Sequence, residues 1–138
     1  MKRIYIASHG ALAEGIKNSL QLIAGSMSDQ IITYSLTPGK SATDFMEQIE
    51  QELQSTPEDQ FIIMGDLYGA SVVNAMLHLT KYENAILLAG VNLSMALQVV
   101  LDSSEKISDE TVDFIIQESK NGIQRLNALP EDNTIEDF

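Results

Sequence analysis

The chain has 138 residues, 20 acidic and 8 basic side chains, a formal net charge of -12 and no cysteine. The length predicts a single domain with one hydrophobic core, and the acidic excess argues against binding to nucleic acid or to anionic membrane surfaces. The lack of cysteine excludes disulfides, thiolate metal sites and a cysteine nucleophile. No apolar run approaches the ~20 residues of a membrane span or suits a signal peptide, so we expect a cytoplasmic protein.

The first predicted element is a strand over residues 4–8 that delivers His9. Its residues are β-branched or aromatic, and Gly10 permits a sharp turn into the apolar-periodic segment that follows. In an open parallel α/β sheet, the binding crevice lies outside the carboxyl ends of the strands. His9 is therefore the first functional candidate in the chain.

Strands and helices alternate along the rest of the chain. The first expected elements are a helix from Leu12 to Gly25, a strand over 31–36, and a helix capped by Ser41 with Phe45, Ile49 and Leu53 facing inward. A strand over 61–64, a helix capped by Ser71 and a strand over 85–88 are expected next. The last two are a short helix over 93–101 and a longer helix after Ser108 bearing Val112, Ile115, Ile116, Ile123 and Leu126. This alternation predicts parallel strands joined by right-handed crossovers. We expect an open three-layer α/β/α sandwich with a mainly parallel four-stranded sheet in the order 2-1-3-4.

Residues 1–128 are expected to form the domain. Residues 129–138 are short and acidic, so they are not expected to pack alone. We interpret them as an acidic tail or an intersubunit segment.

Two strand ends carry polar residues that the expected strand order brings together. His9 follows the first strand and Asp66 follows the third. In the order 2-1-3-4 these strands are neighbours whose loops open a crevice between them. A carboxylate that accepts a hydrogen bond from one imidazole nitrogen fixes the tautomer and leaves the other nitrogen free as a base or nucleophile. His9 and Asp66 are the predicted catalytic residues.

The residues after Asp66 suit an anion. Gly69 allows a tight turn, Ser71 offers a hydroxyl, and the backbone amides that open the next helix point toward the same crevice. The chain lacks the glycine-rich, lysine-containing loop that cradles ATP. A phosphoryl group carried on His9 therefore explains this set better than nucleotide hydrolysis, and we expect no cofactor and no metal.

Two further residues are left without a chemical role. His78 has no second histidine or carboxylate at metal-ligand spacing and is interpreted as a residue of a helix surface. Tyr68 suits either core packing or a partner-facing ring at the mouth of the site.

Three motifs lie in an order typical of one family. Residues 6–15 (IASHGALAEG), 65–75 (GDLYGASVVNA) and 88–95 (LAGVNLSM) resemble the enzyme IIA (EIIA) component of the mannose family of the bacterial phosphoenolpyruvate-dependent sugar phosphotransferase system. The resemblance extends over nearly the whole chain, to about Leu126. Where many relatives read Gly-Gly-Ser-Pro, this chain has Gly69-Ala70-Ser71-Val72 and so lacks the proline.

The resemblance implies a phosphocarrier. By that resemblance, His9 takes phosphate on Nε2 from the phosphocarrier HPr and passes it to the cognate IIB component, which serves the membrane IIC/IID permease, while Asp66 holds the imidazole. It also implies that the backbone near Leu67, Gly69 and Ala70, with the Ser71 hydroxyl, contacts the phosphate. Members of the family are similar in being homodimers that exchange an antiparallel C-terminal strand.

Alternatives remain open at this point. A related phosphoryl-relay subunit of a dihydroxyacetone kinase shares the expected fold and an N-terminal histidine, and a non-catalytic flavodoxin-like module would hold an anion in the same crevice. The transported sugar is not encoded in a site that meets only phosphate and proteins, so mannose, fructose, sorbose, amino sugars and sugar acids such as gluconate all fit.

Overall fold

Within the described residues, 1–129, the computed structural model has a four-stranded sheet in the order β2-β1-β3-β4, with every neighbouring pair parallel. The strands are β1 (Lys2–His9), β2 (Ile31–Leu36), β3 (Gln60–Gly65) and β4 (Ala85–Leu88). The predicted order 2-1-3-4 is confirmed, and the predicted bounds of the second and fourth strands are those observed. The segment 130–138, most of the predicted tail or swapped strand, lies outside the described residues.

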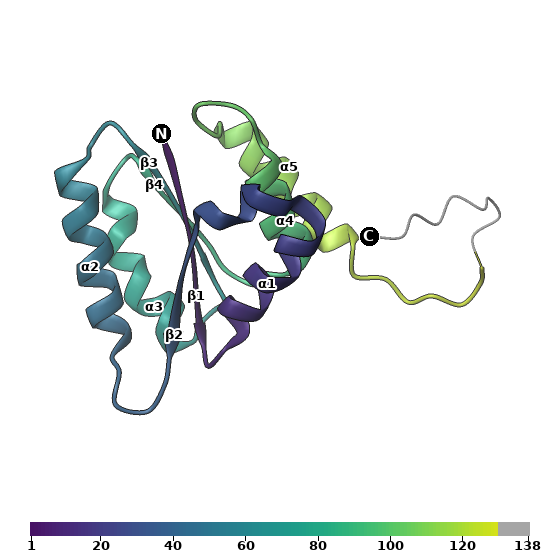
Figure 1. Ribbon diagram of the computed structural model, residues 1–138, viewed down its shortest axis with the longest axis horizontal. Helices are drawn as coiled ribbons and strands as arrows, with labels where there is room; N and C mark the ends of the chain where they lie inside the picture. The colour runs from purple at the N-terminus through teal and green to yellow at the C-terminus, as the bar shows by residue number, and fades with distance from the viewer. Residues whose placement is uncertain (130–138) are drawn as a thin grey trace.

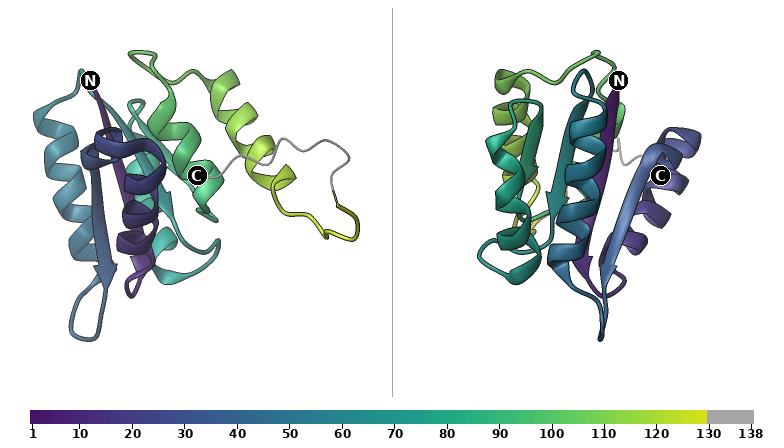
Figure 2. Two further views of the ribbon diagram at one scale, coloured as in Figure 1. Left: turned by 45° about the vertical axis from the view of Figure 1, so that its right-hand side comes forward. Right: turned by 90° about the vertical axis from the view of Figure 1, so that its left-hand side faces the viewer.

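Helices cover both faces of the sheet. The α-helices are α1 (Leu12–Ala24), α2 (Ala42–Ser55), α3 (Ser71–Met76), α4 (Leu93–Leu101) and α5 (Asp109–Asn121), and 3₁₀ turns follow α1 (Gly25–Gln30) and α3 (Leu77–Lys81). Figure 1 shows α2 and α3 on one face, and α1, α4 and α5 on the other; the views in Figure 2 agree. The predicted three-layer sandwich is confirmed.

Alternation along the two central strands builds a core on each face. In β1, Ile4 and Ile6 pack with α1, α4 and α5, whereas Tyr5 and Ala7 pack with α2 and α3. All six residues of β3 are buried. Because a fully buried large apolar side chain contributes about 1.5–3 kcal/mol, these central strands are rigid supports for the residues at their ends.

The last helix is shorter than predicted. It ends at Asn121, and Ile123 and Leu126 beyond it are 78% and 84% exposed rather than packed on the sheet. Gly122 and Ile123 donate their N–H groups back to the carbonyls of the final turn. The apolar spacing continues past the helix, but the backbone turns away from the core at Gly122.

Each helix within residues 1–129 is too short or too polar to span a lipid bilayer.

Candidate functional site

The candidate site lies at the carboxyl edge of the sheet, where the loop from β1 to α1 is at the bottom of Figure 1. Strands β1 and β3 pair in register with Ala7 opposite Gly65, so His9 and Asp66 leave the sheet side by side. The two residues are 57 positions apart in sequence. Their proximity therefore follows from the strand order that the alternation of elements predicts.

The His9 and Asp66 side chains are in direct contact. His9 Nδ1 lies 2.7 Å from Asp66 Oδ2, and the His9 backbone N–H donates to the same oxygen at 2.7 Å. The other carboxylate oxygen, Oδ1, accepts the N–H of Leu67 at 2.8 Å. Backbone amides thus orient the carboxylate, which then orients the ring.

Burial and charge differ between the two partners. The Asp66 side chain is 9% exposed, whereas the His9 side chain is 50% exposed. Desolvation favours the neutral acid, but the hydrogen bonds from the His9 backbone and ring, the charge of His9 and the Leu67 amide outweigh it, so the pKa of Asp66 lies below its ordinary value. The carboxylate is therefore ionised at neutral pH beneath a solvent-accessible imidazole.

Ser71 faces the second ring nitrogen. Its Oγ lies 3.2 Å from His9 Nε2. The prediction that Ser71 caps α3 was wrong: Ala70 occupies the N-cap position, Ser71 is the first helical residue, and no side chain makes a capping hydrogen bond. The hydroxyl turns toward the imidazole instead of the helix backbone, which leaves it available to whatever Nε2 binds.

The loop between Asp66 and α3 is held by its own hydrogen bonds. Gly69 has a φ of 84°, a conformation that glycine adopts without strain. The Leu67 amide donates to Asp66, and the Ala70 amide donates to Leu67 O at 3.2 Å. Of the three backbone positions predicted to contact phosphate, Leu67 and Ala70 therefore have their amides engaged within the loop in this conformation.

Three residues that support the site were not singled out from the sequence. Asn74 Nδ2 donates to Gly69 O at 3.0 Å and so ties the loop to α3. A β-carbon on Gly65 would lie 2.4 Å from Val73 Cγ2, so this glycine permits the close packing of β3 on α3. Ser8, which is fully buried, bonds across the turn that contains His9. Their only sequence signal is their place within the motifs at residues 6–15 and 65–75.

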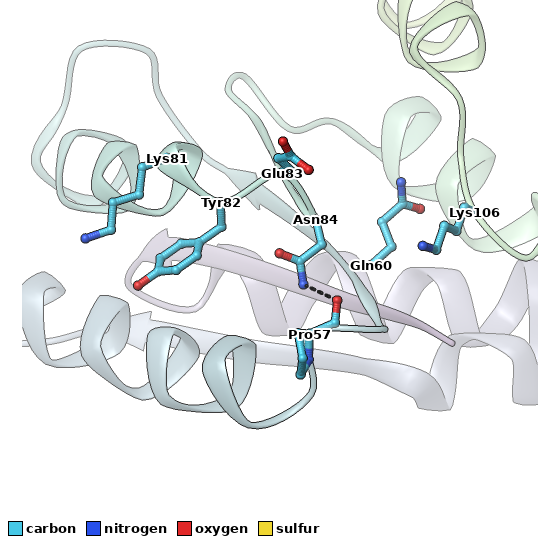
Figure 3. A pocket seen from close by; sticks show the side chains of 7 residues that line it. All are labelled: Pro57, Gln60, Lys81, Tyr82, Glu83, Asn84 and Lys106. Atoms are coloured by element: carbon cyan, nitrogen blue, oxygen red, sulfur yellow. Dashed lines mark hydrogen bonds between the residues drawn. The ribbon is translucent and has the colours of Figure 1, made fainter.

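A cavity of about 490 Å³ lies at the opposite, amino-terminal edge of the sheet. Figure 3 shows Lys81 and Lys106 at opposite ends of this cavity, with Gln60 and Asn84 between them. Gln60 bonds to the backbone of Ile107, and Asn84 donates to backbone carbonyls, so these amides are directed at the protein rather than at a ligand. The cavity is distinct from the His9 site.

No group of three or more histidine, cysteine, aspartate or glutamate side chains in residues 1–129 is arranged to hold a metal ion. The other histidine, His78, pairs with Glu50 on the outer surface, with 2.7 Å between Nε2 and Oε2. Sequence reasoning did not anticipate that carboxylate because it comes from α2.

The sequence model of the family described as the PTS system fructose IIA component matches residues 3–116, a range that includes the whole His9, Asp66 and Ser71 arrangement. The chain belongs to this family. The motif resemblance to phosphotransferase IIA components is thereby confirmed.

Solved structures of IIA proteins agree with this membership. The phosphotransferase system component EIIA from Streptococcus agalactiae is 30% identical, with a TM-score of 0.78 over 91% of this chain and 97% of that chain. The mannose/sorbose specific IIA subunit from Enterococcus faecalis is 26% identical, with a TM-score of 0.78 over 96% of this chain and 100% of that one. Membership in the IIA family supports a phosphotransfer role within a sugar phosphotransferase system, with partners from that system.

Proposed function

We propose that the protein is a cytoplasmic phosphocarrier that accepts a phosphoryl group from phospho-HPr on His9 and passes it to a histidine of the cognate IIB component, which phosphorylates sugar entering through a IIC/IID permease. The observation that carries this proposal is the 2.7 Å contact between His9 Nδ1 and Asp66 Oδ2. It supports a nucleophile at the other ring nitrogen, and family membership supports phosphoryl transfer as the reaction.

Asp66 sets the protonation of the ring. Its ionised carboxylate accepts the Nδ1–H, so the neutral imidazole keeps its lone pair on Nε2. Because the Asp66 pKa lies below its ordinary value, the carboxylate stays ionised at neutral pH. In the tautomer with the proton on Nδ1, Nε2 needs no separate base to remove a proton.

Transfer to His9 is a displacement at phosphorus. The Nε2 lone pair forms a bond to phosphorus while the phosphorus–nitrogen bond of the donor phosphohistidine breaks and its electron pair returns to the donor ring. His9 keeps its proton on Nδ1, so the phosphorylated ring is cationic and the Asp66 carboxylate balances that charge. Transfer to IIB is the same step with His9 as the leaving group.

The groups around Nε2 are suited to the phosphoryl oxygens. The Ser71 hydroxyl, 3.2 Å from Nε2, is a hydrogen-bond donor at the reacting atom. The first N–H groups of α3 have no acceptor inside the helix. We assign the phosphate contacts to Ser71 and to the loop at Leu67, Gly69 and Ala70, whose Leu67 and Ala70 amides would have to exchange their present partners.

Exposed apolar side chains next to the site suit protein partners. Leu67 and Tyr68, directly after Asp66, are 62% and 86% exposed, and Leu12 at the start of α1 is 49% exposed. Aromatic residues are enriched at the centres of protein interfaces. Of the two roles left open for Tyr68, its exposure supports the partner-facing one.

We also propose a homodimer in which residues 1–128 form the IIA domain and residues 129–138 are an acidic tail or an intersubunit segment. Strand β4 is at one edge of the described sheet. Leu87 and Ala89 line apolar cavities of about 330 and 230 Å³ beside that edge. An unpaired strand edge flanked by apolar hollows suits an added strand. Light scattering of the full chain measures the oligomeric state, and a monomer would contradict the dimer.

The carrier function is tested by intact-mass spectrometry after incubation with phosphoenolpyruvate, enzyme I and HPr. We expect an acid-labile gain of one phosphate, ~80 Da, in the wild-type protein. His9→Ala is expected to fold normally and to gain nothing, whereas His78→Ala is expected to gain the phosphate as the wild type does.

The alternatives give different results in the same assay. A gain that requires the donor proteins of a dihydroxyacetone kinase instead of HPr would make the protein a subunit of that kinase. Reversible binding of a phosphate ester or flavin without covalent phosphate would make it an anion-binding module. A gain that survives His9→Ala would remove His9 from the mechanism.

A further inference from the structure

The side chain of Ser8 spans the turn that carries His9. Ser8 is the penultimate residue of β1 and is 0% exposed. Its Oγ donates to Gly10 O at 3.2 Å and accepts the N–H of Ala13 at 2.8 Å. One buried hydroxyl thus connects the end of the strand, the turn after His9 and the first turn of α1.

Helix α1 depends on this hydroxyl at its N-terminus. The N-cap position is Ala11, whose side chain cannot accept a hydrogen bond. The N–H groups of a first helical turn have no acceptor within the helix and are commonly satisfied by a serine, threonine or aspartate at the cap. Here Ser8 supplies the acceptor for Ala13 from the preceding strand. The hydroxyl that caps α1 therefore also holds the turn that carries His9.

The turn itself is held on two sides. Gly10 has a φ of 57°, and its N–H donates to Leu36 O of β2 at 2.8 Å. Its carbonyl is the group that accepts the Ser8 hydroxyl. Loss of the hydroxyl leaves the turn attached to β2 but releases its connection to α1.

His9 is sensitive to the position of this turn. Its backbone N–H and its Nδ1 both address one oxygen, Asp66 Oδ2, at 2.7 Å each. A displacement of the backbone therefore weakens both contacts together. An error of about 1 Å in the placement of a reacting group is enough to slow a reaction about 100-fold.

We propose that Ser8 is a positioning residue for His9: its buried hydroxyl holds the strand-to-helix turn so that Asp66 Oδ2 receives both the backbone and the ring of the histidine. This assignment rests on the proposed function for its effect on phosphoryl transfer. Its effect on the geometry of the imidazole is independent of that function.

The test compares Ser8→Ala with Ser28→Ala. Ser28 is also 0% exposed, and its Oγ donates to Gly25 O at 2.7 Å, at the other end of α1. Both variants therefore remove one buried hydroxyl from a turn that flanks α1, Ser8 before the helix and Ser28 in the 3₁₀ turn after it. A Ser8→Cys variant keeps the shape of the side chain but bonds weakly, and it serves if Ser8→Ala fails to fold.

The first readout is the tautomer of His9, read from its ring ¹⁵N chemical shifts. The chain has 2 histidines, so a His78→Gln spectrum assigns the signals. We expect the wild type and Ser28→Ala to hold the proton on Nδ1, and Ser8→Ala or Ser8→Cys to show both tautomers. Ser8→Thr, which keeps the hydroxyl, is expected to restore the wild-type pattern in its folded fraction.

The second readout is the initial rate of phosphoryl uptake at saturating phospho-HPr. We expect Ser8→Ala to be roughly 10- to 100-fold slower, and Ser28→Ala to be unchanged even if both lose similar stability. An unaltered tautomer and rate in Ser8→Ala, or an equal change in Ser28→Ala, would overturn the proposal. If the wild type takes up no phosphoryl group while Ser8→Ala still alters the tautomer, the carrier function fails and the positioning role stands.

Discussion

Two histidine–carboxylate pairs within residues 1–129 have the same contact distance and different surroundings. His9 and Asp66 meet at 2.7 Å, and so do His78 and Glu50. The histidine side chains are similarly exposed, at 50% and 44%. Neither distance nor exposure therefore distinguishes the candidate site from a surface ion pair.

The carboxylates make the difference. Asp66 accepts two backbone N–H groups besides the ring, whereas Glu50 accepts the Tyr82 hydroxyl and lies 3.6 Å from Lys81 Nζ. Backbone donors at strand ends are rigid, but the partners of Glu50 are side chains on the outside of the molecule. A histidine is positioned for chemistry when its carboxylate is itself fixed by the backbone.

The ring nitrogen that contacts the carboxylate also differs between the two pairs. Asp66 takes Nδ1 of its histidine and leaves Nε2 beside the Ser71 hydroxyl, whereas Glu50 takes Nε2 of His78. The nitrogen left over at His9 is the one farther from the backbone, which a partner protein can reach. This contrast supports a chemical role for His9 and a structural role for His78.

Removal of each carboxylate is expected to give the largest contrast. Asp66→Ala should slow phosphoryl uptake by roughly 10²- to 10⁴-fold, because the ring loses both its fixed tautomer and the counter-charge of its cationic product. Glu50→Ala should leave the rate unchanged. Initial rates from rapid-quench mass spectrometry measure both, and a near-normal rate for Asp66→Ala would remove that residue from the mechanism.

The packing beneath the site is tested by Gly65→Ala. Its new methyl group would lie 2.4 Å from Val73 Cγ2, so α3 must shift together with Ser71; we expect a loss of about 1–3 kcal/mol in the free energy of unfolding and slower uptake. Gly15→Ala is the matched control, since Gly15 is the fourth residue of α1 and nothing lies within 4 Å of its added β-carbon. This variant should raise the free energy of unfolding by about 0.5–1 kcal/mol without altering the rate of phosphoryl uptake. Urea denaturation measures both changes, and equal stability of the two variants would refute the close-packing argument.

Variants of Tyr68 and Tyr82 test which surface meets the protein partner, the one beside His9 or the one around His78. Tyr68→Ala should raise the KM for phospho-HPr about tenfold, equivalent to about 1.4 kcal/mol, with stability nearly unchanged because the side chain is 86% exposed. Tyr82→Phe, which removes the hydroxyl that donates to Glu50, should leave KM unchanged. Steady-state transfer assays decide the matter, and an unchanged KM in Tyr68→Ala would exclude that ring from the interface.

The smallest expected effect concerns acid stability. The pKa of Asp66 is lower in the folded protein than its ordinary 3.8, so its ionised form stabilises the fold fully above that value, and this contribution is lost as the pH falls through the folded pKa. The stability difference between wild type and Asp66→Asn should therefore shrink below about pH 4. Unfolding curves between about pH 3 and 7 measure it.

The contribution of Glu50 to the free energy of unfolding should depend on pH in the same direction. The Tyr82 hydrogen bond, opposed by desolvation and aided by His78 and Lys81, lowers the pKa of Glu50 below its ordinary 4.5. Glu50→Gln should thus resemble Asp66→Asn in acid stability while differing from it in phosphoryl uptake. A pH-independent difference between wild type and Asp66→Asn would contradict the lowered pKa of Asp66.

Much of the fold could be predicted because its signals are local. The apolar faces of α1 and α2, the short β-rich runs and the caps Ser41 and Ser108 lie within single segments, and the observed elements follow them. The end of α5 could not be predicted, because apolar spacing continues beyond Gly122 while the chain leaves the core.

For the candidate site, the sequence allowed us to predict which two strand ends meet. The alternation of strands and helices indicates parallel pairing, and the order 2-1-3-4 brings His9 beside Asp66. The orientation of Ser71 was not predictable, since its hydroxyl has two competing partners, the helix amides and the imidazole. The support from Asn74 and Gly65 was also missed, because each acts through a contact that only the packed structure brings together.

The class of fold, the family and the two residues at the centre of the candidate site, His9 and Asp66, can be inferred from periodicity and motifs along the amino-acid sequence. Which backbone amides hold the Asp66 carboxylate, and that His78 has a carboxylate partner of its own, became known only from the folded structure. The physical reason is that hydrogen bonds and close packing act over a few ångströms, so they depend on where distant segments come to lie and not on their spacing in the sequence.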